Sequence, residues 1–128
     1  MAEPPPSSPE RVRIAFSDTV RAVRERQQTV SRRLSPPPLA VGDLVDAVAS
    51  DWMVRHKGPL TPLAVIRIVS LREEPLSRIL NEPEYGREEL AKEGGPAVTL
   101  PTWALTLLVR YKRLSLDTPL TRIEFEYL

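Results

Sequence analysis

The sequence lacks the residues that most metal and redox sites require. It contains no cysteine and one histidine, His56, among its 128 residues. A disulfide framework and a thiolate metal site are therefore excluded, and a single histidine cannot form the paired-histidine motif of a zinc enzyme. The adjacent Gly94 and Gly95 are not followed by Lys and Ser or Thr, which excludes a P-loop. We therefore predict no metal and no cofactor, and we expect His56 to be an ordinary exposed loop residue.

Long apolar segments are also absent, because no run approaches the roughly 20 residues that span a bilayer. Residues 1–10, MAEPPPSSPE, have neither the basic nor the apolar region of a secretory signal. These absences predict a soluble, cytoplasmic protein without a membrane partner. Since residues 1–10 are rich in proline and serine, we expect a disordered tail there and one domain over residues 11–128.

Arginine is concentrated in one part of the chain. The formal net charge is only +1, yet residues 11–33 carry seven arginines and no lysine against two carboxylates. Arginine binds phosphate and carboxylate groups through paired N–H donors. The segment is therefore typical of a protein with an anionic partner, nucleic acid first. A solvated helix and strand with acidic neighbours elsewhere in the fold would have the same composition, so charge alone leaves both interpretations open.

Alternating and β-branched segments predict strands. The closing LTRIEFEYL places Ile123, Phe125 and Tyr127 on one face and charged residues on the other. The segment from residue 63 is rich in valine and isoleucine, which favour strands. The predicted strands cover approximately residues 11–16, 27–33, 43–50, 63–74 and 119–127.

Helices are predicted between these strands. One runs to about Arg26, with Ser17 or Asp18 as its N-cap. Residues 75–93 form two helical pieces, and Pro101 lies in the first turn of another helix. Because strands and helices are scattered rather than alternating, the sequence predicts an α+β fold on a small, mostly antiparallel sheet or barrel.

The predicted second strand, RQQTVSRRL, has no apolar face. Alternation puts Gln28, Val30 and Arg32 on one face and Thr29, Ser31 and Arg33 on the other, so neither face is apolar. Such a strand makes a poor wall for a hydrophobic core, which indicates a role other than packing.

Three further side chains are candidates for a site. Glu93 ends a helix at two glycines, where the helix dipole does not favour a carboxylate; it is either functional or an exposed charge at a helix end. Trp52 and Trp103 could stack bases. Trp103 lies on the apolar face of a predicted helix, which favours a core position, whereas Trp52 lies in a predicted turn.

The segments RERQQTVSRRL, PPLAVGDLV, IRIVSLREEPLSRI, YGREELAKEGGP and TPLTRIEFEYL, in this order, resemble the landmarks of ASCH-domain proteins. These proteins belong to the PUA-like group, and the resemblance covers about residues 11–128. It implies a small, mostly antiparallel PUA-like β-barrel with surrounding helices and a cleft lined by the second strand. It also implies RNA or nucleotide ligands, because some members resemble RNA-binding modules, others cleave RNA, and one branch removes the acetyl group from acetylcytidine nucleosides.

In this family the second strand carries a motif near Gly-x-Lys-Thr-x-Thr-x-Arg that faces the ligand. Thr29 and Ser31 stand at its two hydroxyl positions, and Arg33 or Arg32 stands at its basic end. Glu93 matches the glutamate of the helix that overlooks the cleft. In the amidohydrolase branch the lysine, the second hydroxyl and this glutamate form the catalytic set.

This chain departs from the motif at two positions. Ser31 replaces threonine and keeps a hydroxyl, whereas Gln28 occupies the lysine position and removes the charge that would activate the nucleophile or stabilise an oxyanion. Arg26 could replace that charge but cannot act as a base. Gln28 and Ser31 are three residues apart, so on a regular strand they face opposite ways. They can serve one cleft only if position 28 lies at an irregular start of the strand.

We therefore expect a nucleic-acid-binding module for RNA or a modified nucleotide. Its phosphate contacts would come from Arg26, Arg32 and Arg33. Its base or sugar contacts would come from Gln28, Thr29 and Ser31, with Glu93 bonding an exocyclic amine.

The alternative is a small hydrolase that acts on a nucleoside amide of the acetylcytidine type or on an RNA phosphodiester, with Ser31 and Glu93 as catalytic residues. A third alternative is an interaction protein whose cleft has lost its ligand. The sequence specifies neither the ligand nor the oligomeric state.

Overall fold

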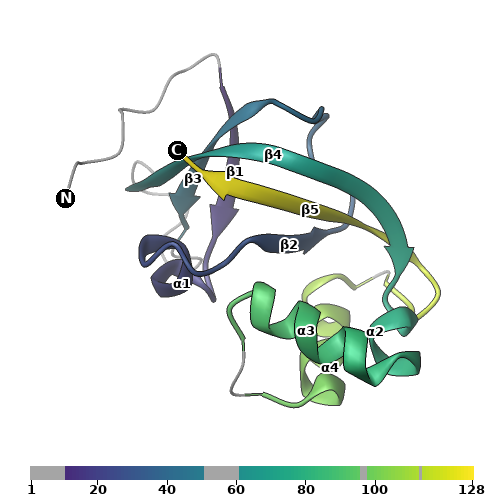
Figure 1. The fold of residues 1–128 in the computed structure, drawn as a ribbon. Coiled ribbons are helices and arrows are strands. Elements are labelled where there is room, and N and C mark those ends of the chain that lie inside the picture. The colour runs from purple at the N-terminus through teal and green to yellow at the C-terminus, as the bar shows by residue number, and fades with distance from the viewer. Residues whose placement is uncertain (1–10, 51–60, 96–97, 113) are drawn as a thin grey trace.

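The computed structural model describes residues 11–50, 61–95, 98–112 and 114–128, which form one sheet and several helices (Figure 1). The strands are β1 (Val12–Phe16), β2 (Val30–Arg33), β3 (Leu44–Ala49), β4 (Thr61–Pro75) and β5 (Pro119–Tyr127). Each predicted strand is present with shifted ends. The expectations for residues 1–10, Trp52 and His56 concern positions outside the described residues.

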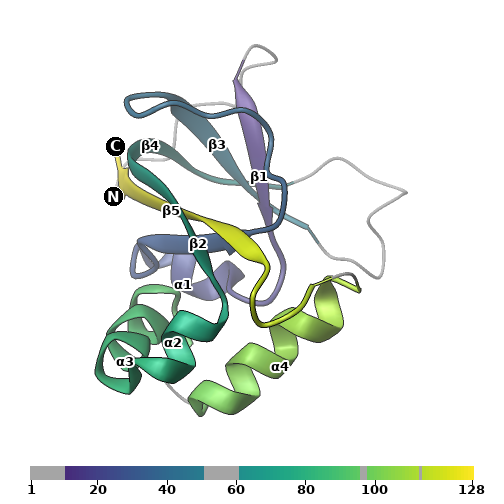
Figure 2. The same cartoon turned by 90° about the vertical axis from the view of Figure 1, so that its right-hand side faces the viewer.

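The strand order is β1-β3-β4-β5-β2. The β1–β3 pairing is parallel, and the other three pairings are antiparallel. The sheet is curled as a half-barrel, in which the long strands β4 and β5 arch together over the molecule and β1 and β2 are the two edges (Figures 1 and 2). The predicted α+β fold with a mostly antiparallel, barrel-like sheet is therefore confirmed.

Four helices accompany the sheet in the described part of the chain. They are α1 (Val20–Arg24), α2 (Ser77–Asn81), α3 (Pro83–Lys92) and α4 (Leu100–Arg110). The two-piece helix and the helix that begins around Pro101 are confirmed, and α2, α3 and α4 gather at one end of the sheet (Figure 2). Even the longest of these helices, α4 with 11 residues, is too short to cross a membrane.

The predicted cap of α1 is wrong. Thr19 is the N-cap residue and makes no side-chain capping hydrogen bond. Asp18 instead pairs with Arg110 at the end of α4. The local preference of Asp for a cap is thus replaced by an ion pair between segments that are distant in sequence.

Apolar side chains form two cores. The first fills the concave side of the sheet, where Phe16 meets Phe125 edge to face with the ring centroids 6.1 Å apart. The second joins α2, α3 and α4 to the beginning of β5, and its buried members include Ile79, Trp103 and Leu120. The expected core position of Trp103 is confirmed, since this side chain is almost fully buried. β2 lies where the two cores meet.

The entry into β2 is irregular. Arg26 adopts a left-handed backbone conformation with φ of 61°, and the amides of Gln27 and Gln28 both donate to the carbonyl of Ala22 in α1. Regular pairing with β5 begins only at Val30. Gln28 therefore precedes the regular strand. This is the irregular start that the spacing of Gln28 and Ser31 requires if both are to face the same cleft.

Candidate functional site

A cleft of about 320 Å³ opens between the ends of β1 and β2 and the helices α3 and α4. This volume lies at the lower end of the range typical of small-molecule sites. The cleft brings together five of the seven residues that the sequence singled out. They are Gln28, Ser31, Arg32, Arg33 and Glu93.

Gln28 lines the cleft and carries a buried hydrogen-bond acceptor. The residue is 2% exposed. Its side-chain amide nitrogen donates to the carbonyl of Val30 at 2.8 Å, which fixes which end of the amide is oxygen. Its Oε1 is buried and has no hydrogen-bond partner among the described residues. Because buried polar atoms are usually paired, an unpaired oxygen beside the cleft is unusual.

Gly94, just after α3, allows the end of α3 to pack closely against α1 beside the cleft. Gly94 has φ of 77°, a conformation that favours glycine. A Cβ at position 94 would lie 2.7 Å from the Cβ of Ala22 and 3.8 Å from Oε1 of Gln28. The glycine thus lets the end of α3 approach α1 and brings Glu93 to the cleft beside Gln28.

Ser31 and Arg33 form a polar pair on the same face of β2. The Nε of Arg33 donates to the Ser31 hydroxyl at 2.8 Å, and the guanidinium lies 4.9 Å from the ring centroid of Phe16. No carboxylate of the described residues forms an ion pair with Arg33. Burial lowers the pKa of Arg33, although Tyr111 and Glu93 act in the opposite direction. The remaining N–H groups of this guanidinium are available to an anion.

Arg32, next in the chain, is instead committed to the interior. Its side chain is 1% exposed and pairs with three carboxylates. These are Glu74 on β4 and Glu89 and Glu93 on or just after α3, with distances of 2.7 Å to Glu89 and 2.6 Å to Glu93. Burial lowers the pKa of Arg32, but these carboxylates outweigh it and raise the pKa overall. Arg32 is therefore not accessible to a phosphate in this structure.

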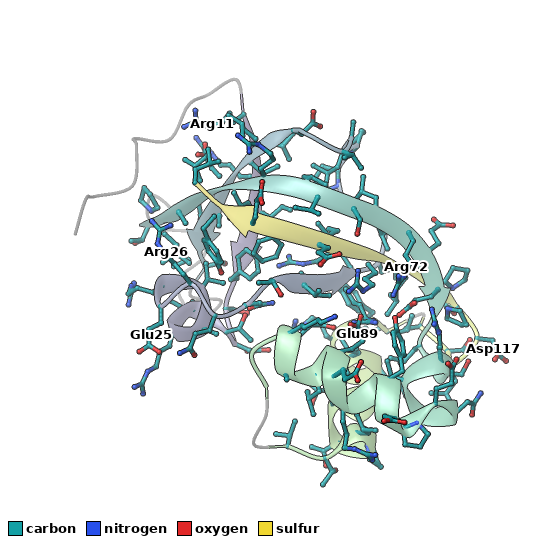
Figure 3. All side chains as sticks on the ribbon, viewed as in Figure 1. Arg11, Glu25, Arg26, Arg72, Glu89 and Asp117 are labelled. Carbon is teal, nitrogen blue, oxygen red and sulfur yellow. The ribbon has the colours of Figure 1, made fainter. Side chains whose placement is uncertain are left out.

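A second buried arginine completes the charge network. Arg122 on β5 lies directly opposite Arg32 in the antiparallel register and pairs with both carboxylate oxygens of Glu89. Burial raises the pKa of Glu89, but hydrogen bonds from Arg122 and Arg32 prevail and lower it to about 2. Figure 3 shows Glu89 at the junction between α3 and the sheet. The network joins α3 to β2, β4 and β5 and holds the floor of the cleft in place.

Glu93 belongs to both the network and the cleft. One carboxylate oxygen accepts from the Arg32 side chain at 2.6 Å, and the other accepts from the Arg32 backbone amide at 3.3 Å. Burial nevertheless raises the pKa of Glu93 to about 7, because it outweighs the attraction of Arg32. The carboxyl group can therefore change its charge near neutral pH.

Arg26 and Thr29 do not line the cleft. Arg26 donates to the carbonyl of Leu128 at 3.0 Å and lies 5.5 Å from the ring centroid of Tyr127. Figure 3 shows it on the α1 side of the molecule, away from Glu89. The backbone of Thr29 bridges Lys92 and Phe125. Both residues connect the strand to its neighbours.

Trp103, which the sequence offered as a base-stacking or core residue, lines the cleft as well as the core and lies 5.5 Å from the guanidinium carbon of Arg32. Sequence reasoning missed the Asp18–Arg110 ion pair, whose two residues also line the cleft. The spacing of Glu89 and Glu93 at i and i+4, which puts both on one face of a helix, could have indicated the buried network. Among the described residues no cluster of ligand side chains suits a metal ion.

The chain has the fold of solved ASCH-domain structures. An ASCH domain from Lactobacillus crispatus JV V101 matches with a TM-score of 0.61 and 16% sequence identity, over 85% of this chain and 69% of that one. A point mutant of ZmASCH from Zymomonas mobilis matches with a TM-score of 0.55 and 10% identity, over 91% and 70%. A DUF984 protein from Enterococcus faecalis V583 matches with a TM-score of 0.61 and 16% identity, over 96% and 78%. No protein-family model and no curated protein matches the sequence.

Proposed function

We propose that residues 11–128 form an ASCH-type, PUA-like module that binds RNA or a modified nucleotide in the cleft beside β2. The observation that carries this proposal is the buried, unpartnered Oε1 of Gln28 in the cleft wall. This oxygen is already withdrawn from water and unpaired, so a ligand whose N–H group reached it would satisfy an acceptor that no described residue pairs. Nucleobases carry the amino and imino N–H donors that satisfy such an acceptor.

Glu93 and Ser31 extend this pattern of acceptors and donors. The ionised Glu93 carboxylate accepts hydrogen bonds, and the Ser31 hydroxyl can donate one while it accepts from Arg33. An exocyclic amine would lie against Glu93 and Gln28, with a base or sugar oxygen near Ser31. The cleft is thus suited to the polar edge of a base rather than to an apolar ligand.

Arg33 is the phosphate contact in this proposal. It lines the cleft and has no carboxylate partner among the described residues, whereas Arg32 is occupied by three. Arg32 acts instead through Glu93, whose carboxylate it holds at both oxygens. The sequence segment of seven arginines therefore divides into residues that organise the fold and residues that meet the ligand.

The experiment is a calorimetric titration with the common ribonucleosides, their 5′-monophosphates and N4-acetylcytidine. We expect binding that is weakened about tenfold or more by Gln28→Met, since a lost hydrogen bond to a desolvated acceptor costs roughly 1–3 kcal/mol. Gln27→Met is the matched control, because Gln27 is the adjacent, exposed glutamine. The melting temperature of each variant separates lost affinity from lost stability. Absence of binding across the panel would refute the proposal.

A second candidate is a small hydrolase acting on a nucleoside amide or an RNA phosphodiester. One observation favours it: Glu93 has a pKa of about 7 and lines the same cleft as Ser31. A carboxyl group titrating near the working pH is suited to general-base catalysis. However, the Ser31 hydroxyl is bonded to Arg33 rather than to Glu93, and Gln28 supplies no positive charge. The geometry therefore supports binding better than turnover.

A further inference from the structure

A smaller hollow adjoins the cleft. It measures about 210 Å³ and is lined by the middle of β1, the end of β2 and the turn that follows β2. Ala15, Arg33 and Tyr111 line both the hollow and the cleft. Since β1 and β2 are the two edges of the half-barrel, the hollow and the cleft are neighbouring compartments of one groove along the open side of the sheet.

The junction between the compartments combines a cation with an aromatic ring. Arg33 uses Nε for Ser31, and its other N–H groups face no carboxylate partner among the described residues. Tyr111 is half-buried at the same junction. Proteins that bind single-stranded nucleic acid combine these two groups, because arginine contacts the phosphate and an aromatic ring stacks on a base.

The outer hollow is suited to an extended, anionic ligand. Its lining contains no acidic residue. Arg13 is exposed there, and it forms no ion pair with the described part of the chain. Pro36 and Pro37 also line the hollow, and they follow Ser35, which has a left-handed conformation with φ of 50°. Proline fixes its own φ angle and lacks an N–H donor, so these two residues contribute apolar rings to the lining of the hollow.

We propose that the groove binds a dinucleotide step of single-stranded RNA rather than one isolated nucleotide. One base occupies the cleft beside Gln28, the connecting phosphate lies on Arg33, and the adjoining nucleotide lies in the outer hollow. The next phosphate then lies beside Arg13. This inference rests on the proposed function and adds to it the length of the ligand and the direction in which it leaves the cleft.

The test compares mononucleotides with the matching RNA homotrinucleotides by calorimetry. A trinucleotide supplies phosphates on both sides of its central nucleotide, so the comparison does not depend on strand polarity. We expect the trinucleotide to bind about tenfold or more tightly, as one additional stacked base predicts. Arg13→Gln should weaken trinucleotide binding several-fold and leave mononucleotide binding unchanged. Arg87→Gln is the control, because Arg87 is exposed on α3 and lines neither compartment.

Two results would overturn this inference in distinguishable ways. Equal affinity for mononucleotide and trinucleotide, with no effect of Arg13→Gln, would show a single-nucleotide site and leave the proposed function intact. Failure of both probes to bind would remove the proposed function and this inference together. Melting temperatures of the variants confirm that each one is folded.

Discussion

Arg32 and Glu93 are joined twice, once through the side chain of the arginine at 2.6 Å and once through its backbone amide at 3.3 Å. The first contact fixes the guanidinium, and the second fixes the carboxylate against β2. The end of α3 is thereby attached to the strand that lines the cleft. A buried charge pair of this kind gives little net stability by itself, but removing one partner leaves the other charge uncompensated.

Arg32→Met should therefore destabilise the protein strongly. The substitution would leave Glu74, Glu89 and Glu93 without their shared partner in a buried region, which costs roughly 3–5 kcal/mol in comparable cases. Urea unfolding measures the change. Arg87→Met is the matched control, because Arg87 is exposed on α3 and substitutions of exposed residues away from such networks change stability by about 0.5 kcal/mol or less. If Arg32→Met unfolds at the same urea concentration as the wild type, the network does not have this role.

The titration of Glu93 should appear in the pH dependence of stability. Burial raises the pKa of Glu93 to about 7 from the ordinary 4.5 of a glutamate, so between these two pH values the folded protein binds more protons than the unfolded chain. The contribution of Glu93 to stability is therefore present at low pH and is lost as pH rises to about 7, with a total of about 3 kcal/mol. Glu89, whose pKa is lowered to about 2, has the opposite effect and loses its contribution below about pH 4.5.

Urea unfolding at pH 5 and pH 8 separates the two carboxyl groups, since Glu89 remains ionised at both values. The wild type should lose the contribution of Glu93 between pH 5 and pH 8, whereas Glu93→Gln has no such contribution to lose. The free energy of unfolding of Glu93→Gln should therefore rise relative to that of the wild type from pH 5 to pH 8. A constant difference between the two proteins across this range would show that Glu93 does not titrate there.

The salt dependence of RNA binding should identify the phosphate contact. Each phosphate contact on a single strand contributes roughly −0.7 to the slope of log affinity against log salt. Arg33→Gln should flatten the slope by about this amount, whereas Arg26→Gln should leave it unchanged, because Arg26 lies outside the cleft against Tyr127. If Arg26→Gln flattens the slope and Arg33→Gln does not, the phosphate contact lies at Arg26, before the start of β2.

The hydrolase alternative makes a separate prediction. We expect little or no turnover of N4-acetylcytidine by the wild type, because Gln28 lacks the charge that stabilises a developing oxyanion. Gln28→Lys should raise the rate if Ser31 and Glu93 act together. Chromatographic detection of released cytidine measures it. Rapid turnover by the wild type that is abolished by Glu93→Gln would show that the protein is an enzyme and would contradict the binding-module proposal.

The sequence predicted the strands well because their signals are local. Alternation in β5, valine and isoleucine in β4 and the glycine that ends α3 each determine structure within a few residues. The irregular start of β2 was also predictable, since Gln28 and Ser31 could share a cleft in no other way.

The separate roles of Arg32 and Arg33 could not be predicted from the sequence. The two residues are adjacent and chemically identical, and they differ only in what the fold places opposite them. Arg32 meets carboxylates 42, 57 and 61 residues further along the chain, while Arg33 meets Ser31 and the ring of Phe16. Pairings over such distances depend on the register of the sheet and the docking of α3, which no local pattern contains.

The central claim is that the cleft beside Gln28 binds a nucleotide. Its most direct test is a nuclear magnetic resonance titration with an RNA trinucleotide that follows the side-chain amide of Gln28, with the exposed amide of Gln27 as the internal control. We predict that the Gln28 amide and the backbone amides of Ser31 and Arg33 shift in a saturable manner, while the side-chain amide of Gln27 does not. Saturable shifts confined to other surfaces, with these cleft signals unchanged, would contradict the account.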